Sequence, residues 1–259
     1  MSEADVRFER EGAIAWVTLA RPAKLHALTP AMLDRLEQIA RAIDADVALR
    51  AVVLTAEGER AFCVGADIGA WSALPPLDMW RQWTRRGHQV FDQWARLRQP
   101  VIAALNGHAF GGGLELAITA DLRLASTGAE FALPEASIAT CPGWSGSQRL
   151  VRLVGPAQAK YLALGGQRIG AERALACGLV HELHRPEALL AAARALAEAI
   201  AARAPVAVQL TKQLIDAATG EGTAAALEGM AGALSASTAD AAEGLAAFRE
   251  RRPAQFRGQ

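Results

Sequence analysis

Two glutamates and a run of three glycines lie near the middle of the chain. Gly111–Gly113 is followed by Glu115 inside an apolar stretch, and Glu135 comes later, directly after Pro134. Glycine has no Cβ atom, so a ligand can approach the backbone closely at these positions. Free N–H groups at the start of a helix stabilise negative charge. Two carboxylates beside such an anion site suit acid–base chemistry next to a carbonyl group.

The sequence around these residues predicts the elements that position them. Val101–Leu105 is a short apolar run typical of a buried strand, and Asn106-Gly107 ends it. After the glycines, Leu114–Ala120 predicts an apolar helix, and Leu122–Ser126 predicts another short strand. The first glutamate is therefore expected in the first turn of a helix that follows a strand and a glycine turn.

Strands and helices also alternate in the N-terminal part of the chain. Val6–Arg10 and Ile14–Leu19 predict a hairpin, and Ala51–Thr55 predicts a strand buried on both faces. Between them, Pro30–Asp44 predicts an amphipathic helix, because Thr29 is a good cap residue before a proline at the first helical position. The fold class predicted from this alternation is α/β.

The C-terminal part of the chain is predicted to be helical. Before it we expect the helices Ser145–Leu153 and Pro156–Gly165, broken at Gly155-Pro156, then the helix Ala171–Cys177 and the short strand Leu179–Leu183. From Pro186 onward no strand pattern remains. We therefore predict an α/β core over residues 1–200 and a helical region over residues 201–259.

Composition limits the class of protein. Of the 259 residues 52% are hydrophobic, and the 27 Lys and Arg residues balance the 27 Asp and Glu residues. This zero net charge gives no overall field for nucleic acid. We see neither a secretory signal nor an apolar stretch that could span a bilayer, and the three cysteines are scattered without metal-ligand spacing. The prediction is a cytoplasmic protein without a metal site, with neither nucleic acid nor membrane as a partner.

Aromatic residues gather in one segment before the central strand. Trp80, Trp83, Phe91 and Trp94 recur at helical spacing within Leu77–Leu97. The favoured interpretation is the core face of one helix, and the alternative is a wall over an apolar substrate.

Five segments, in the same order, resemble the crotonase superfamily of enoyl-CoA hydratases and isomerases over nearly the whole chain. They read LARPAKLHALTPAM, AFCVGADI, PVIAALNGHAFGGGLELAITADLRLAS, FALPEASIATCPGWSGSQRL and RLVGPAQAKYLALGGQRIGAERALACGLV. The resemblance implies a crotonase (ClpP/crotonase-like) spiral of ββα units, with a helical C-terminal region that forms trimers or dimers of trimers. It also implies a coenzyme A thioester as substrate, with no further cofactor.

The resemblance assigns binding roles to two distant loops. The backbone N–H groups of Ala66 and Gly112 correspond to the two donors that hold the thioester oxygen. Residues of the first loop and of the loop before the first helix correspond to coenzyme A contacts, with Lys24 a candidate for a phosphate: Lys24, Ala27, Ala66, Asp67, Ile68 and Gly69.

The resemblance also assigns catalytic roles to the two glutamates. Taken alone, Glu115 could be a solvated helix residue and Glu135 a loop or cap residue. At these positions the family carries two catalytic glutamates, and the presence of both favours hydration over isomerisation or hydrolysis. The implied mechanism has Glu115 accept a proton from water and Glu135 donate a proton at Cα.

Some residues depart from the family pattern. His26 stands where asparagine is common, and Trp144 and Ser145 stand where small residues are frequent. Trp144, together with Trp71, is a candidate wall of the acyl pocket, although a packing role for Trp144 is an equal alternative. Cys63 is expected to have no nucleophilic role.

Three other functions stay open. The first is an enoyl-CoA isomerase that uses mainly Glu135, and the second is a decarboxylase or thioester hydrolase acting on another acyl group. The third is a non-catalytic scaffold or RNA-binding trimer, against which the neutral charge and the two glutamates both argue.

Overall fold

The computed structural model describes residues 5–220 and 222–259 of the chain. The chain forms two compact units, Met1–Val208 and Gln209–Gln259. The division lies inside a helix, eight residues after the predicted boundary at residue 200 (208 − 200 = 8). Among the described residues, no helix is both long and apolar enough to cross a membrane.

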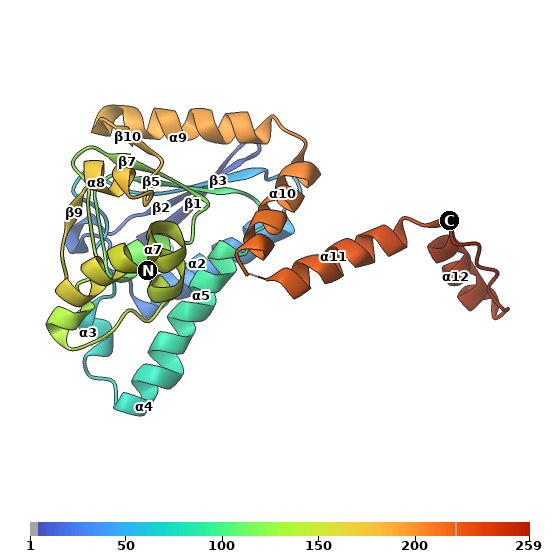
Figure 1. Ribbon diagram of the computed structural model, residues 1–259, viewed down its shortest axis with the longest axis horizontal. Helices are drawn as coiled ribbons and strands as arrows, with labels where there is room; N and C mark the ends of the chain where they lie inside the picture. The colour runs from blue at the N-terminus through green and yellow to red at the C-terminus, as the bar shows by residue number, and fades with distance from the viewer. Residues whose placement is uncertain (1–4, 221) are drawn as a thin grey trace. The chain divides into compact units, whose positions relative to one another are not determined.

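The larger sheet of the first unit has six strands in the order β1-β2-β3-β5-β7-β10 (Figure 1). Only the β1–β2 pair is antiparallel, as the predicted hairpin requires. The strands are β1 (Val6–Glu11), β2 (Ile14–Leu19), β3 (Ala51–Ala56), β5 (Val101–Leu105), β7 (Leu122–Ser126) and β10 (Glu182–His184).

A second sheet of four short strands has the order β4-β6-β8-β9, comprising β4 (Ala61–Cys63), β6 (His108–Phe110), β8 (Glu130–Ala132) and β9 (Ile169–Gly170). The pairs β3/β4, β5/β6 and β7/β8 each contribute one strand to each sheet. The chain therefore repeats the same path three times, which is the winding expected of a spiral of ββα units.

Glycine is required where β5 passes into β6. A Cβ atom at Gly107 would lie 2.4 Å from the carbonyl carbon of Arg60, so only glycine fits this crossing. The neighbouring Asn106 amide donates hydrogen bonds to the carbonyl oxygens of Gly58 (2.7 Å) and Ala61 (3.1 Å). Two successive turns of the spiral are thus tied together at this point.

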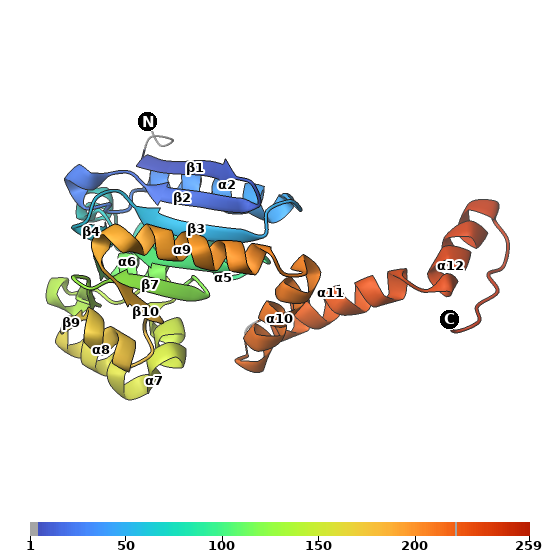
Figure 2. The ribbon, with the colours of Figure 1, turned by 90° about the horizontal axis from the view of Figure 1, so that it is seen from above.

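Helices cover both faces of the larger sheet. Alternate residues of β3 point to opposite sides, so Val52 and Leu54 join the main core while Ala51 and Val53 pack toward α9 (Pro186–Ala201). Figures 1 and 2 show α9 along one face of the sheet, with α2 (Pro30–Ala45) and α5 (Arg85–Ala95) on the other. Both faces are buried, which explains the continuous apolar strands.

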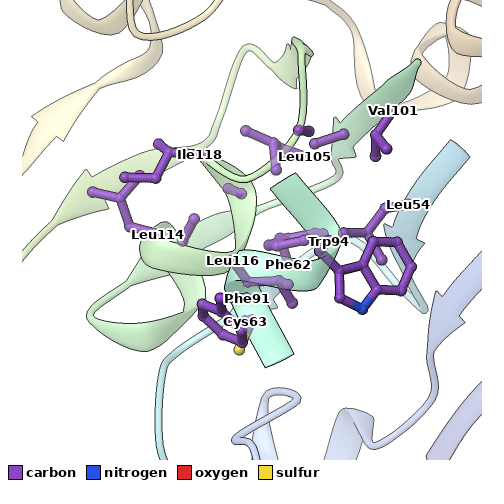
Figure 3. Packing of buried hydrophobic residues seen from close by; sticks show 14 of the residues in the cluster. Leu54, Phe62, Cys63, Phe91, Trp94, Val101, Leu105, Leu114, Leu116 and Ile118 are labelled. Carbon is purple, nitrogen blue, oxygen red and sulfur yellow. The ribbon is translucent and has the colours of Figure 1, made fainter. Parts of the chain in front are cut away.

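The main core fixes α5 in place. Figure 3 shows part of this core, in which Phe91 and Trp94 of α5 belong to one cluster with Leu54 of β3 and Leu116. The indole Nε1 of Trp94 donates a hydrogen bond of 3.1 Å to the carbonyl oxygen of Leu36 in α2. This bond satisfies the one polar atom of a side chain that is otherwise fully buried.

The remaining helices of the first unit are α3 (Ile68–Trp71), α4 (Pro76–Asp78), α6 (Gly112–Ala117), α7 (Gly146–Gly165) and α8 (Ala171–Ala176). A π-helical turn over Met79–Thr84 joins α4 to α5. The predicted break at Gly155-Pro156 is confirmed, because Gly155 has a φ of 75° inside α7.

Two predicted boundaries were wrong. The strand predicted at Leu179–Leu183 begins later in the chain, as β10 (Glu182–His184). Leu179 and Val180 instead close the turn after α8, because their N–H groups both bond to the carbonyl oxygen of Ala174. The helix placed at Leu114–Ala120 is observed as α6, which starts at Gly112 and ends at Ala117. Glycine and apolar residues carry little signal for the exact ends of so short a helix.

The C-terminal helices are α10 (Pro205–Ala218), α11 (Thr223–Ala236) and α12 (Ala239–Glu250). Thr238 caps α12, since its hydroxyl accepts a hydrogen bond of 3.1 Å from the N–H of Ala241. The all-helical character predicted for the end of the chain is confirmed.

Candidate active site

Glu115 is the fourth residue of α6 and is only 3% exposed. Its Oε1 accepts two backbone hydrogen bonds, from Trp144 (2.8 Å) and from Gly146 (2.7 Å). Burial raises the pKa of Glu115, while these backbone donors and the charge of Arg149 act in the opposite direction. The interpretation of Glu115 as a solvated helix residue is therefore wrong.

The two donors to Glu115 come from one strained turn. Ser145 lies between them and has a φ of 81°, a conformation that a side-chain-bearing residue rarely adopts. Its hydroxyl is 3.1 Å from Nδ1 of His88 in α5. We infer that this contact holds the turn in the conformation that directs both N–H groups toward the carboxylate.

Glu135 begins a 3₁₀ turn that follows β8 and Pro134. Its Oε2 is buried, and within the described part of the chain it has no hydrogen-bond partner. Burial, followed by the nearby charge of Glu115, raises the pKa of Glu135 to about 7. A carboxyl group with this pKa is present in both protonation states near neutral pH, as general acid–base catalysis requires.

Two backbone N–H groups lie near the glutamates. A Cβ atom at Gly65 would lie 3.2 Å from the nitrogen of Gly112, and a Cβ at Gly112 would lie 3.6 Å from the nitrogen of Ala66. The loop that contains Gly65 and Ala66 therefore meets the loop that contains Gly112, although the two are distant in sequence. The backbone φ of Gly65 is 103°, a conformation that favours glycine. Across residues 5–220 and 222–259, neither the Ala66 nor the Gly112 N–H donates to a protein acceptor.

The carboxylates and both donors face one cavity of about 590 Å³. The structure brings most of the predicted site residues into its lining: Ala66, Ile68, Trp71, Gly112, Glu115, Glu135 and Trp144. Such an arrangement can polarise a carbonyl oxygen and place a proton acceptor and a proton donor beside the neighbouring carbons.

Four predicted coenzyme A contacts lie outside the lining of this cavity: Lys24, Ala27, Asp67 and Gly69. The guanidinium group of Arg21 connects the two loops that carry these residues. It donates hydrogen bonds to the carbonyl oxygen of Ala27 (2.8 Å) and to the carboxylate of Asp67 (2.7 Å). This contact with Arg21 lowers the pKa of Asp67. Lys24 is exposed at the end of a 3₁₀ turn, Pro22–Lys24. Contact of these residues with coenzyme A stays a prediction.

The cavity wall also contains residues that sequence reasoning did not assign to it. They include Met79 and Thr84, the two ends of the π-helical turn, and residues 137–143, which run from the 3₁₀ turn of Glu135 into the following loop. The core interpretation of the aromatic segment holds for Trp83, Phe91 and Trp94, and Trp83 also lines the cavity. Trp80 is 63% exposed and fits neither interpretation. The backbone donors of residues 144 and 146 were also missed, because any residue type supplies an N–H.

Trp144 combines the two roles that the sequence left open. It lines the cavity and is 3% exposed, packed with its ring centroid 5.2 Å from that of Trp83 and 5.1 Å from that of Phe91. Its backbone also holds Glu115.

His26 and Cys63 form a buried structural contact. His26 Nδ1 accepts a hydrogen bond of 3.1 Å from the N–H of Arg21, so its Nε2 donates to the carbonyl oxygen of Glu57 at 3.0 Å. The Cys63 thiol donates to the carbonyl oxygen of His26, and burial raises the pKa of that thiol to about 12. A thiol with this pKa is a poor nucleophile, in agreement with the expectation for Cys63.

Comparisons with known proteins agree with this geometry. The sequence model of the family described as Enoyl-CoA hydratase/isomerase matches residues 9–259. The chain is 40% identical over 250 residues to a short-chain-enoyl-CoA hydratase of Clostridium acetobutylicum, covering 96% of this chain and 95% of that one. It is 39% identical over 259 residues to an (E)-benzylidenesuccinyl-CoA hydratase of Thauera aromatica, covering 98% and 99% of the two chains.

Comparison with solved structures also finds enoyl-CoA hydratases. The crystal structure of an enoyl-CoA hydratase from Bacillus anthracis matches with a TM-score of 0.82 at 34% identity, covering 98% of this chain and 100% of that chain. The predicted crotonase fold is thereby confirmed. The residues matched by the family model begin within β1 and include the rest of both sheets, the loops of the cavity and the C-terminal helices. The chain belongs to the enoyl-CoA hydratase/isomerase family.

Proposed function

We propose that this protein is an enoyl-CoA hydratase, which adds water reversibly to a trans-2-enoyl-CoA and forms a 3-hydroxyacyl-CoA. The observation that carries the proposal is one cavity lined by two carboxyl groups and by Ala66 and Gly112, whose backbone N–H groups donate to no acceptor in the described part of the chain. The names of the relatives support hydration, and they differ in the acyl group, which they therefore leave open.

The thioester carbonyl oxygen is proposed to bind the N–H groups of Ala66 and Gly112. As water adds at Cβ, negative charge moves onto this oxygen, and donors already aimed at it stabilise the enolate. Removing one such donor from an enzyme typically costs about 3–4 kcal/mol of transition-state stabilisation. Since both donors belong to the backbone, side-chain substitution at Ala66 leaves them in place.

Glu115 is proposed to accept the proton of the attacking water. The backbone hydrogen bonds to its Oε1 favour the ionised form and oppose the burial that raises its pKa. The oxygen of the water forms a bond with Cβ, the π electrons move toward the thioester, and one proton of the water passes to Glu115.

Glu135 is proposed to donate the proton at Cα. A pKa of about 7 makes the protonated form available at neutral pH, and Glu135 lines the cavity that is proposed to bind the substrate. The Cα–H bond forms as the enolate collapses, and the carboxyl group becomes a carboxylate. One proton then passes from Glu115 to Glu135, directly or through water, which restores both groups.

The test is hydration of crotonyl-CoA, followed by loss of the absorbance of the conjugated thioester. We expect turnover in the wild type and a loss of at least about 100-fold in kcat for both Glu115→Gln and Glu135→Gln. Glu130→Gln is the matched control, because Glu130 is partly exposed and lies outside the cavity lining. Absence of hydration in the wild type, with conversion of a 3-enoyl-CoA instead, would identify an isomerase.

We further propose a homotrimer or a dimer of trimers, with residues 201–259 as the trimerisation region. In the unit Gln209–Gln259 several large apolar side chains are more than half exposed, as expected of surfaces that pair with another chain: Leu227, Leu234, Leu245, Phe248 and Phe256. Sedimentation equilibrium tests this, and a monomer at micromolar concentration would contradict it.

Three further predictions accompany this function. Coenzyme A is expected to contact Lys24 and the loop Ala66–Gly69, so Lys24→Ala is expected to raise KM with little change in kcat. No cofactor besides the thioester is expected, and dialysis against a chelator tests this. A cytoplasmic location is expected, and cell fractionation tests it.

A further inference from the structure

We propose that Trp144 sets the length of the acyl group that this enzyme accepts, and that it restricts the substrate to short chains. This inference rests on the proposed hydratase function and specifies its substrate class. It assigns to one side chain a role in selecting substrates that is separate from the contact of its backbone with Glu115.

The indole of Trp144 is seated between two glycines. A Cβ atom at Gly87 in α5 would lie 2.1 Å from both Nε1 and Cε2 of the indole, and a Cβ at Gly112 would lie 2.8 Å from Cζ3. One edge of the ring therefore fills the space above Gly87, and the other edge lies against the proposed thioester-binding loop. Any side chain at Gly87 would have to displace the ring.

The indole packs against two other aromatic rings. Its ring is tilted 53° to that of Trp83 and meets Phe91 edge-on at 69°, with centroid distances of 5.2 and 5.1 Å. Phe91 is fully buried and does not line the cavity. The cavity thus ends at Trp83 and Trp144.

The acyl group must point toward this end. The lining also includes Ile68 and Ile138, which are both about half exposed, whereas Trp83 and Trp144 are buried, so we infer that the cavity opens beside the isoleucines. A large coenzyme A moiety can remain only at the open side, so the acyl chain extends inward past Glu115 and Glu135. Carbons beyond Cβ then meet the indole.

The wall cannot withdraw when a longer chain arrives. The backbone N–H of Trp144 bonds to Glu115 at 2.8 Å, and the hydroxyl of the next residue, Ser145, contacts His88 of α5. Movement of the indole away from the cavity is also blocked by Gly87 and Phe91. A close-packed wall of this kind excludes extra methylene groups rather than adapting to them.

The experiment measures kcat/KM for trans-2-enoyl-CoA substrates of four, six, eight and ten carbons. We expect the wild type to prefer the four-carbon substrate and to lose activity steadily with length. Trp144→Ala, and Trp144→Leu as a variant that keeps more packing, should reverse this trend. Each methylene that the enlarged cavity buries should raise relative kcat/KM about fourfold. Trp16→Phe is the control, because Trp16 packs in the separate cluster with α9.

A second variant tests the seating of the ring. Gly87→Ala should lower kcat/KM for crotonyl-CoA, because the new methyl group forces the indole toward the cavity. In the Trp144→Ala background the same Gly87→Ala change should have little effect, because its clash partner is gone. A purely structural role of Gly87 predicts equal losses in both backgrounds and would contradict the proposal.

The two hypotheses fail separately. If the wild type hydrates no enoyl-CoA of any length, the proposed function is wrong. If it hydrates the eight-carbon substrate as well as crotonyl-CoA, or if both Trp144 variants keep the wild-type length profile, hydration stands and the role of Trp144 is wrong.

Discussion

Glu115 and Gly146 are joined by a hydrogen bond of 2.7 Å from the backbone N–H of Gly146 to the carboxylate. The same glycine has no room for a side chain, since a Cβ atom would lie 2.7 Å from Oε1 and 2.8 Å from Cγ of Glu115. The position of the buried carboxylate therefore depends on a residue that contributes only backbone.

Gly146→Ala is expected to lower kcat for crotonyl-CoA hydration by about 10- to 100-fold, because a displacement of about 1 Å at a reacting group has effects of this size. The folded state should persist, as judged by circular dichroism. Gly170→Ala is the control, because nothing lies within 4 Å of a Cβ at Gly170 and its φ of −76° suits alanine. Equal activity of the two variants would show that Glu115 is not positioned by this contact.

The pH dependence of hydration should follow Glu135. Its pKa of about 7 means that the proton donor is lost as the pH rises through 7. We expect kcat/KM for hydration and kcat/KM for dehydration of 3-hydroxybutyryl-CoA to fall in parallel above that pH, because the reaction exchanges no net proton with the solvent and the glutamate pair must hold one proton at the start in either direction. A flat hydration profile between pH 6 and 9 would contradict the role of Glu135.

The same group should affect stability. Between its ordinary pKa of 4.5 and its folded value of about 7, the folded state keeps a proton that the unfolded state loses. The free energy of unfolding must therefore fall as the pH rises through this window, by up to about 3 kcal/mol from this group. Glu135→Gln removes the contribution, so its stability relative to wild type should rise from pH 5 to pH 8. Urea titrations at several pH values measure this difference.

Gly107 is expected to be essential for folding. A methyl group there would meet the backbone of Arg60 and Ala61 at about 2.5 Å, and backbone cannot move aside cheaply. We expect Gly107→Ala to lower the free energy of unfolding by at least about 2 kcal/mol. Gly128→Ala is a matched control between the next two strands of the spiral, where a Cβ meets nothing within 4 Å.

The cysteines should differ in reactivity. Cys141 is exposed at the cavity, whereas Cys63 is fully buried with a thiol pKa of about 12. An aromatic disulfide reagent should label Cys141 quickly and Cys63 only after unfolding. Acetyl-CoA should slow the fast labelling, and Cys141→Ser should remove it. Fast labelling that persists in Cys141→Ser would place the reactive thiol elsewhere.

Much of the local structure was predictable because local patterns specify it. The apolar run Val101–Leu105, which follows Pro100 and ends at Asn106-Gly107, predicts a buried strand, and it is β5. Thr29 before Pro30 marks the start of α2, and its hydroxyl accepts a hydrogen bond from the N–H of Met32. The glycines at 65 and 111 adopt positive φ, as glycine-rich loops often require.

The resemblance to a family supplied the rest of the predicted site. Neither the pairing of Ala66 with Gly112 nor the facing of Glu115 and Glu135 is contained in residue spacing alone. Both depend on how successive turns of the spiral stack, which is a property of long-range contacts. The residues that sequence reasoning left outside the cavity wall, such as Met79 and Thr84, come from a π-helical turn whose orientation is also set by packing.

The sequence by itself determined the α/β alternation, the glycine loops, the two candidate carboxylates and the aromatic segment, because each of these features depends only on residues that are close together in the chain. Only the tertiary structure decided that Glu115 is buried and held by two N–H groups, and that the pKa of Glu135 is raised. It alone also placed Trp144 on Gly87. Burial, hydrogen bonding and steric exclusion depend on residues distant in the chain, so they exist only once the chain has folded.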